Sequence, residues 1–220
     1  MVAVSPYELR AMTEADISQV AAIERESFPS IWPQTAYKRE LTNRLARYLV
    51  VVDRSQAAPA VEPSKRSRWW PFRRRQQQAP TTSDFIVAYV GVWLMVDETH
   101  IVAIAVRPAY RRRGLGELLL QEIIDLALAS DQETVTLEVR RSNLAAQTLY
   151  EKYRFLKVGV RRRYYTDNGE DAIVMSTPPI RRGSYQELLA YLKEQHARRW
   201  AAGGGETGAS SEEGAAAAEA

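Results

Sequence analysis

The hexapeptide Arg111-Arg112-Arg113-Gly114-Leu115-Gly116 decides the fold of this chain. It follows the apolar run His100–Val106 and opens an amphipathic segment, Leu115–Ala129. This order predicts a strand, a basic glycine-containing turn and the first turn of a helix. Glycines let backbone N–H groups approach a ligand closely, and a helix N-terminus carries partial positive charge. The sequence therefore predicts a site for a phosphate diester at this turn.

Two common phosphate-binding motifs are excluded here. Leu119 stands where the dinucleotide-binding fingerprint needs a third glycine, and no Gly-Lys-Ser/Thr follows as in a P-loop. A solvated basic loop is the alternative. The sequence of the neighbouring segments distinguishes a phosphate-binding turn from such a loop.

Composition limits the class of protein. The chain has 220 residues and no cysteine, so it can form one core of ordinary size, but neither a disulfide framework nor a thiolate metal site. Its first residues contain no charged segment followed by an apolar stretch, and no window is long and apolar enough for a membrane span. We therefore expect a cytoplasmic protein with no transmembrane segment.

The formal net charge of +3 is unevenly distributed. Residues 54–83 carry seven basic residues and one acidic residue, whereas residues 201–220 carry four glutamates and no basic residue. The rest of the chain is close to neutral, so no field of the whole domain favours nucleic acid.

Hydrophobic periodicity predicts one mixed α/β domain, made of residues 1–53 and 84–178. A helical extension over 179–200 and a disordered tail over 201–220 are expected to follow. The predicted order is β-α-α-β-β-β-α-β-α-β-β, then the last helix. Strands are expected over 7–12, 48–52, 85–93, 98–106, 134–139, 155–164 and 171–176, and helices over 13–26, 34–43, 115–129, 143–153 and 184–199.

Residues 54–83 form a segment of different composition, with four prolines, a glutamine tract and arginines around Trp69-Trp70-Pro71-Phe72. The segment has no period, so we expect a disordered basic insertion in the turn between two antiparallel strands. Arginines with interleaved aromatic rings also suit contact with RNA, the ribosome or an anionic membrane. The alternative is an inert solvated loop.

The order of elements, with Arg-x-x-Gly-x-Gly after the fourth strand, resembles the GNAT acyltransferases. The resemblance covers residues 7–52 and 84–178, and it implies a central mixed, mostly antiparallel sheet flanked by helices. Arg111 stands where many members have Gln, and Arg154 stands where the family commonly has Gly. If residue 154 is a left-handed helix cap, an arginine there costs about 1–2 kcal/mol.

Six further motifs, in the same order as in the family, resemble one branch of it, the RimI-type ribosomal-protein alanine N-acetyltransferases. These motifs are Glu24–Pro29, Asp97–Ile101, Leu137–Arg140, Asn143–Ala146, Leu149–Tyr150, and Arg162–Tyr165 with Gly169–Ala172.

The resemblance implies acetyl-CoA as co-substrate and no metal. It assigns main-chain contacts with the pantetheine arm of the cofactor to Ile104, Ala105 and Val106, which would also be a buried strand. It assigns the cofactor's pyrophosphate to Arg112, Arg113, Gly114, Leu115, Gly116 and Glu117. Asn143 suits the N-cap of the following helix, and the resemblance adds a contact with the cofactor.

Acetyl transfer to an amine requires a proton acceptor for the ammonium and a proton donor for the leaving thiolate. The resemblance makes Glu138 the general base, acting through water, and Tyr150 the general acid. The pattern alone also fits an exposed strand carboxylate at Glu138 and a core aromatic at Tyr150. His100 is an alternative base, although its position on a strand favours a structural role.

The acceptor peptide is expected to contact Phe28, Pro29, Tyr164 and Tyr165, since tyrosines pack on short side chains while their hydroxyls bond peptide groups. For the two tyrosines, alternation on a strand with one ring buried is the alternative.

The resemblance thus implies an N-α-acetyltransferase acting on the N-terminal segment of a ribosomal protein, the alanine of the eighteenth protein of the small subunit. An α-amino group titrates near 8 and a lysine near 10.4, a difference of about 3 kcal/mol in deprotonation at a common pH. This favours an N-terminal amine. The alternatives are an acetyltransferase for lysines or small amines, and a non-catalytic GNAT-fold module held on RNA or the ribosome by residues 54–83.

Overall fold

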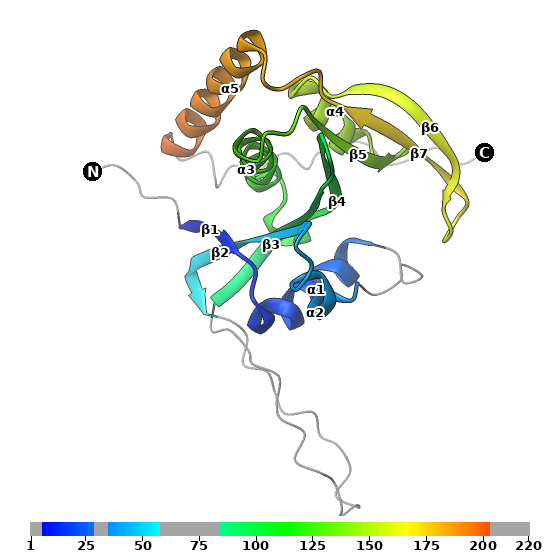
Figure 1. Cartoon of the computed structure of the whole chain (residues 1–220). Coiled ribbons are helices and arrows are strands. Elements are labelled where there is room, and N and C mark those ends of the chain that lie inside the picture. Colours follow the sequence, from blue (N-terminus) through cyan, green and yellow to red (C-terminus); the bar gives the residue numbers. More distant parts are fainter. Residues whose placement is uncertain (1–5, 29–34, 58–83, 203–220) are drawn as a thin grey trace, which may run out of the picture.

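The computed structural model describes residues 6–28, 35–57 and 84–202, which form a seven-stranded sheet with helices on both faces (Figure 1). In chain order the elements are β1 (Tyr7–Ala11), the 3₁₀ turn η1 (Glu14–Asp16), α1 (Ile17–Ser27), α2 (Tyr37–Glu40), β2 (Ala46–Ala57), β3 (Asp84–Leu94), β4 (Glu98–Val106), η2 (Pro108–Tyr110), α3 (Leu115–Ala129), β5 (Thr134–Arg140), α4 (Leu144–Lys152), β6 (Leu156–Tyr165), β7 (Glu170–Ser176) and α5 (Gly183–Ala201).

The strand order is β1-β2-β3-β4-β5-β7-β6. Neighbouring strands are antiparallel except β4 and β5, which run parallel. A parallel pair needs a crossover connection, and α3 supplies it. The predicted mixed, mostly antiparallel sheet is therefore confirmed.

Each face of the sheet has its own apolar core. On one face α1 and α2 cover Val50, Val52 and Ile86. On the other, α3, α4 and α5 cover Val51 and Val87, which point the opposite way because side chains alternate along a strand. Figure 1 shows α1 and α2 on the side of the sheet opposite α3 and α5.

The predicted bounds of β2 and of the second helix are wrong. β2 continues to Ala57, which pairs with Asp84, so residues 54–57 belong to the strand and not to the insertion. The polar composition of these residues is typical of a linker, and it hid the strand from the sequence analysis. The end of a hairpin can pair through its backbone alone and needs no apolar side chains. The second helix is limited to Tyr37–Glu40, since the chain turns after it and the Asn43 side chain accepts from the Leu45 amide, 3.0 Å away.

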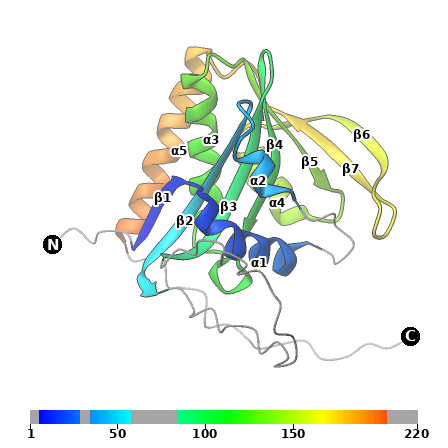
Figure 2. The ribbon, with the colours of Figure 1, turned by 60° about the horizontal axis from the view of Figure 1, so that its bottom comes forward.

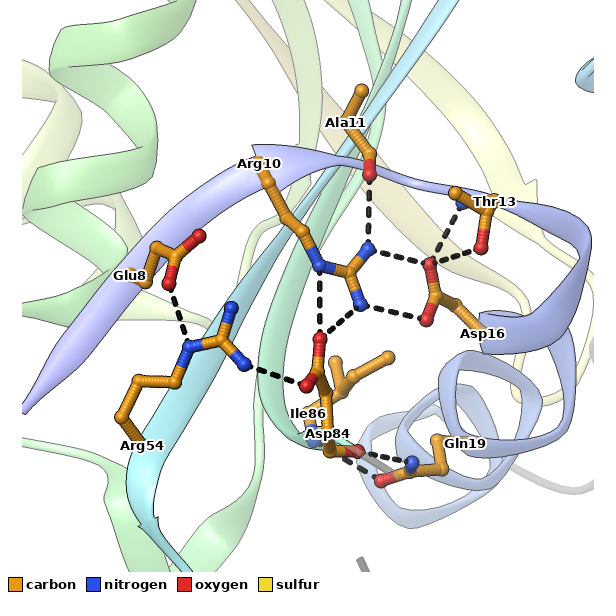
Figure 3. Close-up of polar contacts among 9 residues, drawn as sticks. All are labelled: Glu8, Arg10, Ala11, Thr13, Asp16, Gln19, Arg54, Asp84 and Ile86. Atoms are coloured by element: carbon orange, nitrogen blue, oxygen red, sulfur yellow. Dashed lines mark hydrogen bonds and ion pairs between the residues drawn. The ribbon is translucent and has the colours of Figure 1, made fainter. Parts of the chain in front are cut away.

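A polar network ties the first strands together where the insertion leaves the sheet (Figure 3). The Arg10 guanidinium donates to both carboxylate oxygens of Asp16, at 2.7 and 2.9 Å, and to Asp84 at 2.9 Å. Arg54 donates to the other oxygen of Asp84, at 2.6 Å. The Gln19 side chain donates to the Asp84 carbonyl at 2.7 Å. Contacts among the described residues thus hold the two strand ends that flank residues 58–83.

Several expectations concern residues outside the described parts. These are the disorder expected of residues 58–83 and 203–220, any RNA or ribosome contact through the insertion, and the contact of Pro29 with a peptide. The last helix is described, and it extends to Ala201 rather than Arg199. Among the helices of the described ranges, none combines the length and apolar character needed to cross a bilayer.

Candidate active site

The parallel strands β4 and β5 separate part-way along their length. In the described structure their pairing ends where Ile101 lies opposite Leu137. β4 has a one-residue bulge at Val102, which is skipped in the register with β3, and bulges bend a strand. β5 stays paired with β7 as far as Arg140. The backbone edge of β4 after the bulge is therefore unpaired on the β5 side.

A cavity of about 270 Å³ lies at this separation. Residues of the two diverging strands line it, together with aromatic residues that follow α1 or lie in β3, α4 and β6. The lining residues are Ser27, Phe28, Trp93, His100, Ile101, Val102, Ala103, Ile104, Leu137, Glu138, Val139, Arg140, Asn143, Tyr150, Tyr164 and Tyr165. Eight of the candidate site residues from the sequence are among them, namely Phe28, His100, Ile104, Glu138, Asn143, Tyr150, Tyr164 and Tyr165.

Glu138 is not an exposed strand carboxylate, because only 7% of its side chain is accessible. Its Oε2 lies 3.1 Å from Nε2 of His100, and its Oε1 lies 2.9 Å from Nη2 of Arg161. The hydrogen bond from His100 lowers the pKa of Glu138 against the opposing effect of burial, and the charge of Arg161 lowers it further. An ionised carboxylate therefore lies in the cavity at neutral pH.

His100 connects Glu138 to a hydroxyl group. Its Nδ1 is 2.9 Å from Oγ1 of Thr136, while its Nε2 faces Glu138. The imidazole thus links two groups of β5 across the start of the separation. His100 also lines the cavity, so it makes these structural contacts and belongs to the candidate site at the same time.

Tyr150 is both a core aromatic and a lining residue. It is 5% exposed, its ring lies 5.7 Å from that of Phe155, and it borders the cavity. Burial raises the pKa of its hydroxyl. Within the described ranges, its hydroxyl makes no hydrogen bond with protein. A protonated phenol is therefore available to a ligand in the cavity.

The predicted phosphate turn presents unpaired amides. In the part of the chain that the structure describes, none of the N–H groups from Arg112 to Glu117 has a protein acceptor, whereas the next one, Leu118 N–H, bonds the Gly114 carbonyl at 2.9 Å. Positive φ occurs at alternate residues, 65° at Arg112 and 83° at Gly114. When right-handed and left-handed backbone conformations alternate along a chain, successive N–H groups point toward one position, as in anion-binding nests. The turn is therefore shaped for an anion.

The side chain of Glu117 does not face this turn. Its carboxylate accepts hydrogen bonds from Tyr153, at 2.8 Å, and from Lys152. Burial opposes its ionisation, but these hydrogen bonds outweigh burial and lower its pKa. Only the main chain of Glu117 is left for the cofactor contact expected of it.

Between the cavity and the turn lie Ile104, Ala105 and Val106. Their β3-side edge is paired, with Val106 opposite Ala88. On the other side, Arg111 Nε donates to the Val106 carbonyl at 3.2 Å. Ala105 is buried and its two neighbours are half-buried, and apart from the Val106 carbonyl the edge of the strand away from β3 is left for a ligand.

Asn143 caps α4, as expected: its side chain accepts from the Ala146 amide at 3.2 Å. It also lines the cavity, so the two roles expected of it are compatible.

Of the candidates for the acceptor, Phe28, Tyr164 and Tyr165 meet at the cavity. Tyr165 is 8% exposed, with the Arg140 guanidinium 3.9 Å from its ring centre, and Tyr164 is 39% exposed. One ring of the pair is thus buried, as alternation on a strand predicts, and the other is accessible at the cavity.

Sequence reasoning missed Trp93 and Arg161, which also lie at the site. Trp93 is opposite His100 in the β3–β4 register. Arg161 reaches Glu138 from the edge strand β6. No motif marks either residue, because both are brought in by strand pairing. Among residues 6–28, 35–57 and 84–202, no group of three or more His, Asp or Glu side chains is placed to hold a metal ion.

A family model supplies the identification. The model described as the acetyltransferase (GNAT) family matches residues 17–155. The chain belongs to this family. It is an acetyltransferase, and the expected resemblance to the RimI-type branch is confirmed by its relatives.

Three relatives of this acetyltransferase carry related names. A Bacillus subtilis (strain 168) protein, provisionally named a [ribosomal protein bS18]-alanine N-acetyltransferase, is 34% identical over 76% of this chain and 92% of that protein. The Escherichia coli (strain K12) [ribosomal protein bS18]-alanine N-acetyltransferase is 42% identical over 44% of this chain and 68% of that one. The N-alpha-acetyltransferase RimI of Mycobacterium tuberculosis is 32% identical over 77% and 91% of the two chains.

Two solved structures of acetyltransferases are also similar to this chain. The ribosomal-protein-S18-alanine N-acetyltransferase from Escherichia coli is similar with a TM-score of 0.59 and 26% identity, over 79% of this chain and 94% of that one. Arabidopsis thaliana NAA60 in complex with acetyl-CoA has a TM-score of 0.60 at 17% identity, over 78% and 99% of the chains, and so shows the shared fold.

Proposed function

We propose that this acetyltransferase transfers the acetyl group of acetyl-CoA to a protein N-terminus, and that its acceptor is the N-terminal alanine of ribosomal protein bS18. The names of the relatives support this acceptor. One structural observation carries the chemistry. The unpaired edge of β4 lies between a turn with free N–H groups and a cavity that contains Glu138 and Tyr150. Such an acceptor would place the reaction in the cytoplasm.

The site residues divide the work between binding and proton transfer. The diphosphate of the cofactor would accept hydrogen bonds from the amides of residues 112–117, and its pantetheine arm would follow residues 104–106. The thioester would then reach the cavity. Phe28, Tyr164 and Tyr165 would border the N-terminal residue of the acceptor.

Three proton movements accompany the reaction. The α-ammonium gives one proton to Glu138 through water, and the free amine attacks the thioester carbon. The C–N bond forms, the C–S bond breaks, and the thiolate takes a proton from the Tyr150 hydroxyl. The attacking nitrogen then loses its second surplus proton, which returns through water to the Tyr150 phenolate, and Glu138 releases its proton to solvent. Burial keeps this phenol protonated until the thiolate appears, and each such transfer contributes about 10²–10⁴-fold in rate.

An acceptor panel tests the substrate class. We expect the highest kcat/KM with a peptide that begins with the bS18 alanine, a much lower value with the same peptide blocked at its N-terminus, and lower values with internal-lysine peptides or polyamines. An N-terminal amine is the easier nucleophile, by about 3 kcal/mol of deprotonation at a common pH. Equal or higher values with lysine peptides or polyamines would reject the proposed acceptor.

Kinetics of two isosteric variants test the assigned roles and the non-catalytic alternative. Glu138→Gln and Tyr150→Phe should each lower kcat by about 10²-fold or more. Calorimetric affinity for coenzyme A should stay near the wild-type value, because neither side chain belongs to the turn of residues 112–117. Unchanged rates in both variants would remove both roles.

A further inference from the structure

The C-terminal helix α5 lies outside the region matched by the family model, which ends at residue 155. It runs alongside α3, as both ribbon views show (Figures 1 and 2). Its buried side chains Tyr185, Leu189 and Leu192 belong to the core on that face. These contacts explain why the helix is docked, but they lie before its last turns.

The last turns of α5 contact the anion-binding turn through two ring nitrogens. Trp200 Nε1 donates to the Arg113 carbonyl at 2.9 Å, and His196 Nε2 lies 3.1 Å from the Gly114 carbonyl. The two rings pack together, with centroids 4.6 Å apart. Burial outweighs the nearby Glu117 and lowers the pKa of His196, so a neutral ring with its proton on Nε2 suits this acceptor.

There is no spare room between α5 and the turn. A Cβ atom added at Gly114 would lie 2.8 Å from both His196 Nε2 and Trp200 Nε1. Arg199 adds a third contact, since its Nη2 donates to Glu117 Oε2 at 2.6 Å. The helix therefore holds both the turn and the first turn of α3.

Peptide geometry relates these contacts to the ligand side. In a trans peptide the carbonyl of one residue and the N–H of the next point in opposite directions, and the described chain has no cis bond. A bond from Trp200 to the Arg113 carbonyl thus directs the Gly114 N–H away from α5. A bond from His196 to the Gly114 carbonyl does the same for the Leu115 N–H. Both of these N–H groups belong to the set without a protein acceptor.

We propose that α5 is part of the cofactor site, with Trp200 and His196 as positioning residues that hold two peptide planes so that their N–H groups receive a diphosphate. This rests on the proposed use of acetyl-CoA. The two contacts act in two ways. They hold a turn with positive φ at two residues, so that less conformational entropy is lost when the ligand binds. They also polarise the peptide units whose N–H groups donate.

The matched pair Trp200→Phe and His196→Phe tests this proposal, because each variant keeps a ring and loses its N–H donor. A neutral hydrogen bond contributes about 1 kcal/mol, so each variant should weaken coenzyme A binding about fivefold in calorimetry. The KM for acetyl-CoA should rise by a similar factor, with kcat changed by less than about twofold. Leu189→Ala is the control: it weakens α5 packing and lowers Tm, but it should leave the affinity for coenzyme A unchanged.

A truncated donor distinguishes positioning from general damage. S-acetylpantetheine lacks the diphosphate, so its kcat/KM should be the same in wild type and in both ring variants. Equal losses with the truncated donor and acetyl-CoA, or coenzyme A affinity unchanged in both variants, would overturn the proposal. If the wild-type protein gave no heat with coenzyme A, the proposed function itself would fail, which is a separate result.

Discussion

At Glu138 both carboxylate oxygens have partners, His100 on one side and Arg161 on the other. These interactions stabilise the ionised form and lower the pKa of the group. A base of this kind accepts a proton less readily than an isolated carboxylate, but it remains deprotonated in mildly acidic solution. Its position beside an imidazole also gives the proton a second acceptor close by.

The pH–rate profile of His100→Leu tests this arrangement. Without the hydrogen bond from His100, the pKa of Glu138 should rise, since the charged form loses a donor. Activity needs the deprotonated base, so it is present above that pKa and lost as pH falls through it. The acid limb of kcat/KM for the alanine peptide should therefore move to higher pH. Thr136→Val, which removes only the other partner of the ring, should move it less; an unchanged limb in His100→Leu would contradict the argument.

At Asp16, too, hydrogen bonds stabilise an ionised carboxylate against burial, but there the group supports the fold and not the reaction. It is fully buried, and burial opposes its ionisation. Hydrogen bonds from Arg10 and from Thr13 outweigh burial and lower its pKa below the ordinary 3.8. The stabilisation from this network is present above that ordinary value and is lost as pH falls through the lower folded value.

Asp16→Asn should lower the free energy of unfolding by about 2–4 kcal/mol near neutral pH, because Arg10 loses its buried ionic partner. The difference from wild type, measured by urea unfolding, should shrink in acid. Glu8→Gln is the matched control: Glu8 pairs with Arg54 at the surface, with side chains 49% and 47% exposed, and solvent screens such pairs so that they contribute little to stability. Equal effects of the two substitutions would contradict the network's importance.

At the scale of single elements, α4 ends in an unfavourable backbone conformation. Arg154 follows the helix with φ of 61°, so the condition for the cost considered in the sequence analysis, a left-handed cap at this residue, is met. The Phe155 amide bonds the Tyr150 carbonyl at 3.1 Å across this cap. Arg154 is exposed, so its side chain offers little compensation.

Arg154→Gly should raise the free energy of unfolding by about 1 kcal/mol, because glycine adopts positive φ without strain. Chemical denaturation measures the change. Arg162→Gly, an exposed position within β6, is the control and should lower the free energy of unfolding, since glycine weakens a strand. Loss of stability in Arg154→Gly would mean that the arginine side chain makes a favourable contact there.

At the scale of the whole molecule, contacts among the described residues fix the two strand ends that flank residues 58–83. Ala57 pairs with Asp84 at the end of the β2–β3 hairpin, and Asp84 is fixed by Arg10 and Arg54. The cavity lies at the β4–β5 separation, and none of its described lining residues comes from this hairpin end.

Replacement of residues 58–83 by Asn-Gly, a dipeptide that favours a two-residue hairpin turn, should leave kcat and KM for the free peptide within about twofold of wild type. Tm should rise, because closing a shorter loop costs less entropy. Steady-state kinetics and thermal unfolding measure the two effects. A large fall in kcat/KM for free peptide would assign these residues a part in catalysis.

Much of the fold was predictable because its signals are local. The bounds of β4 and α3 follow from periodicity, and Asn143 was recognised as a cap position from its place in the chain. The left-handed cap at Arg154 was raised only as a possibility, from the resemblance to a family that commonly has Gly there. The predicted bounds of α2 were too wide and the extension of β2 was missed, since a single turn of helix and a polar hairpin end have no period of their own.

By itself the sequence determined the mixed sheet, the amide-rich turn at Arg112–Glu117 and the separate positions of Glu138 and Tyr150. Only the tertiary structure decided which groups surround them. The cluster of His100, Glu138 and Arg161 comes from three strands, and its distances depend on the β4 bulge and on sheet order. The hydrogen bonds from α5 to the turn, His196 to Gly114 and Trp200 to Arg113, join residues more than eighty positions apart. Contacts over such separations are set by packing of whole elements, so no local pattern of side chains specifies them.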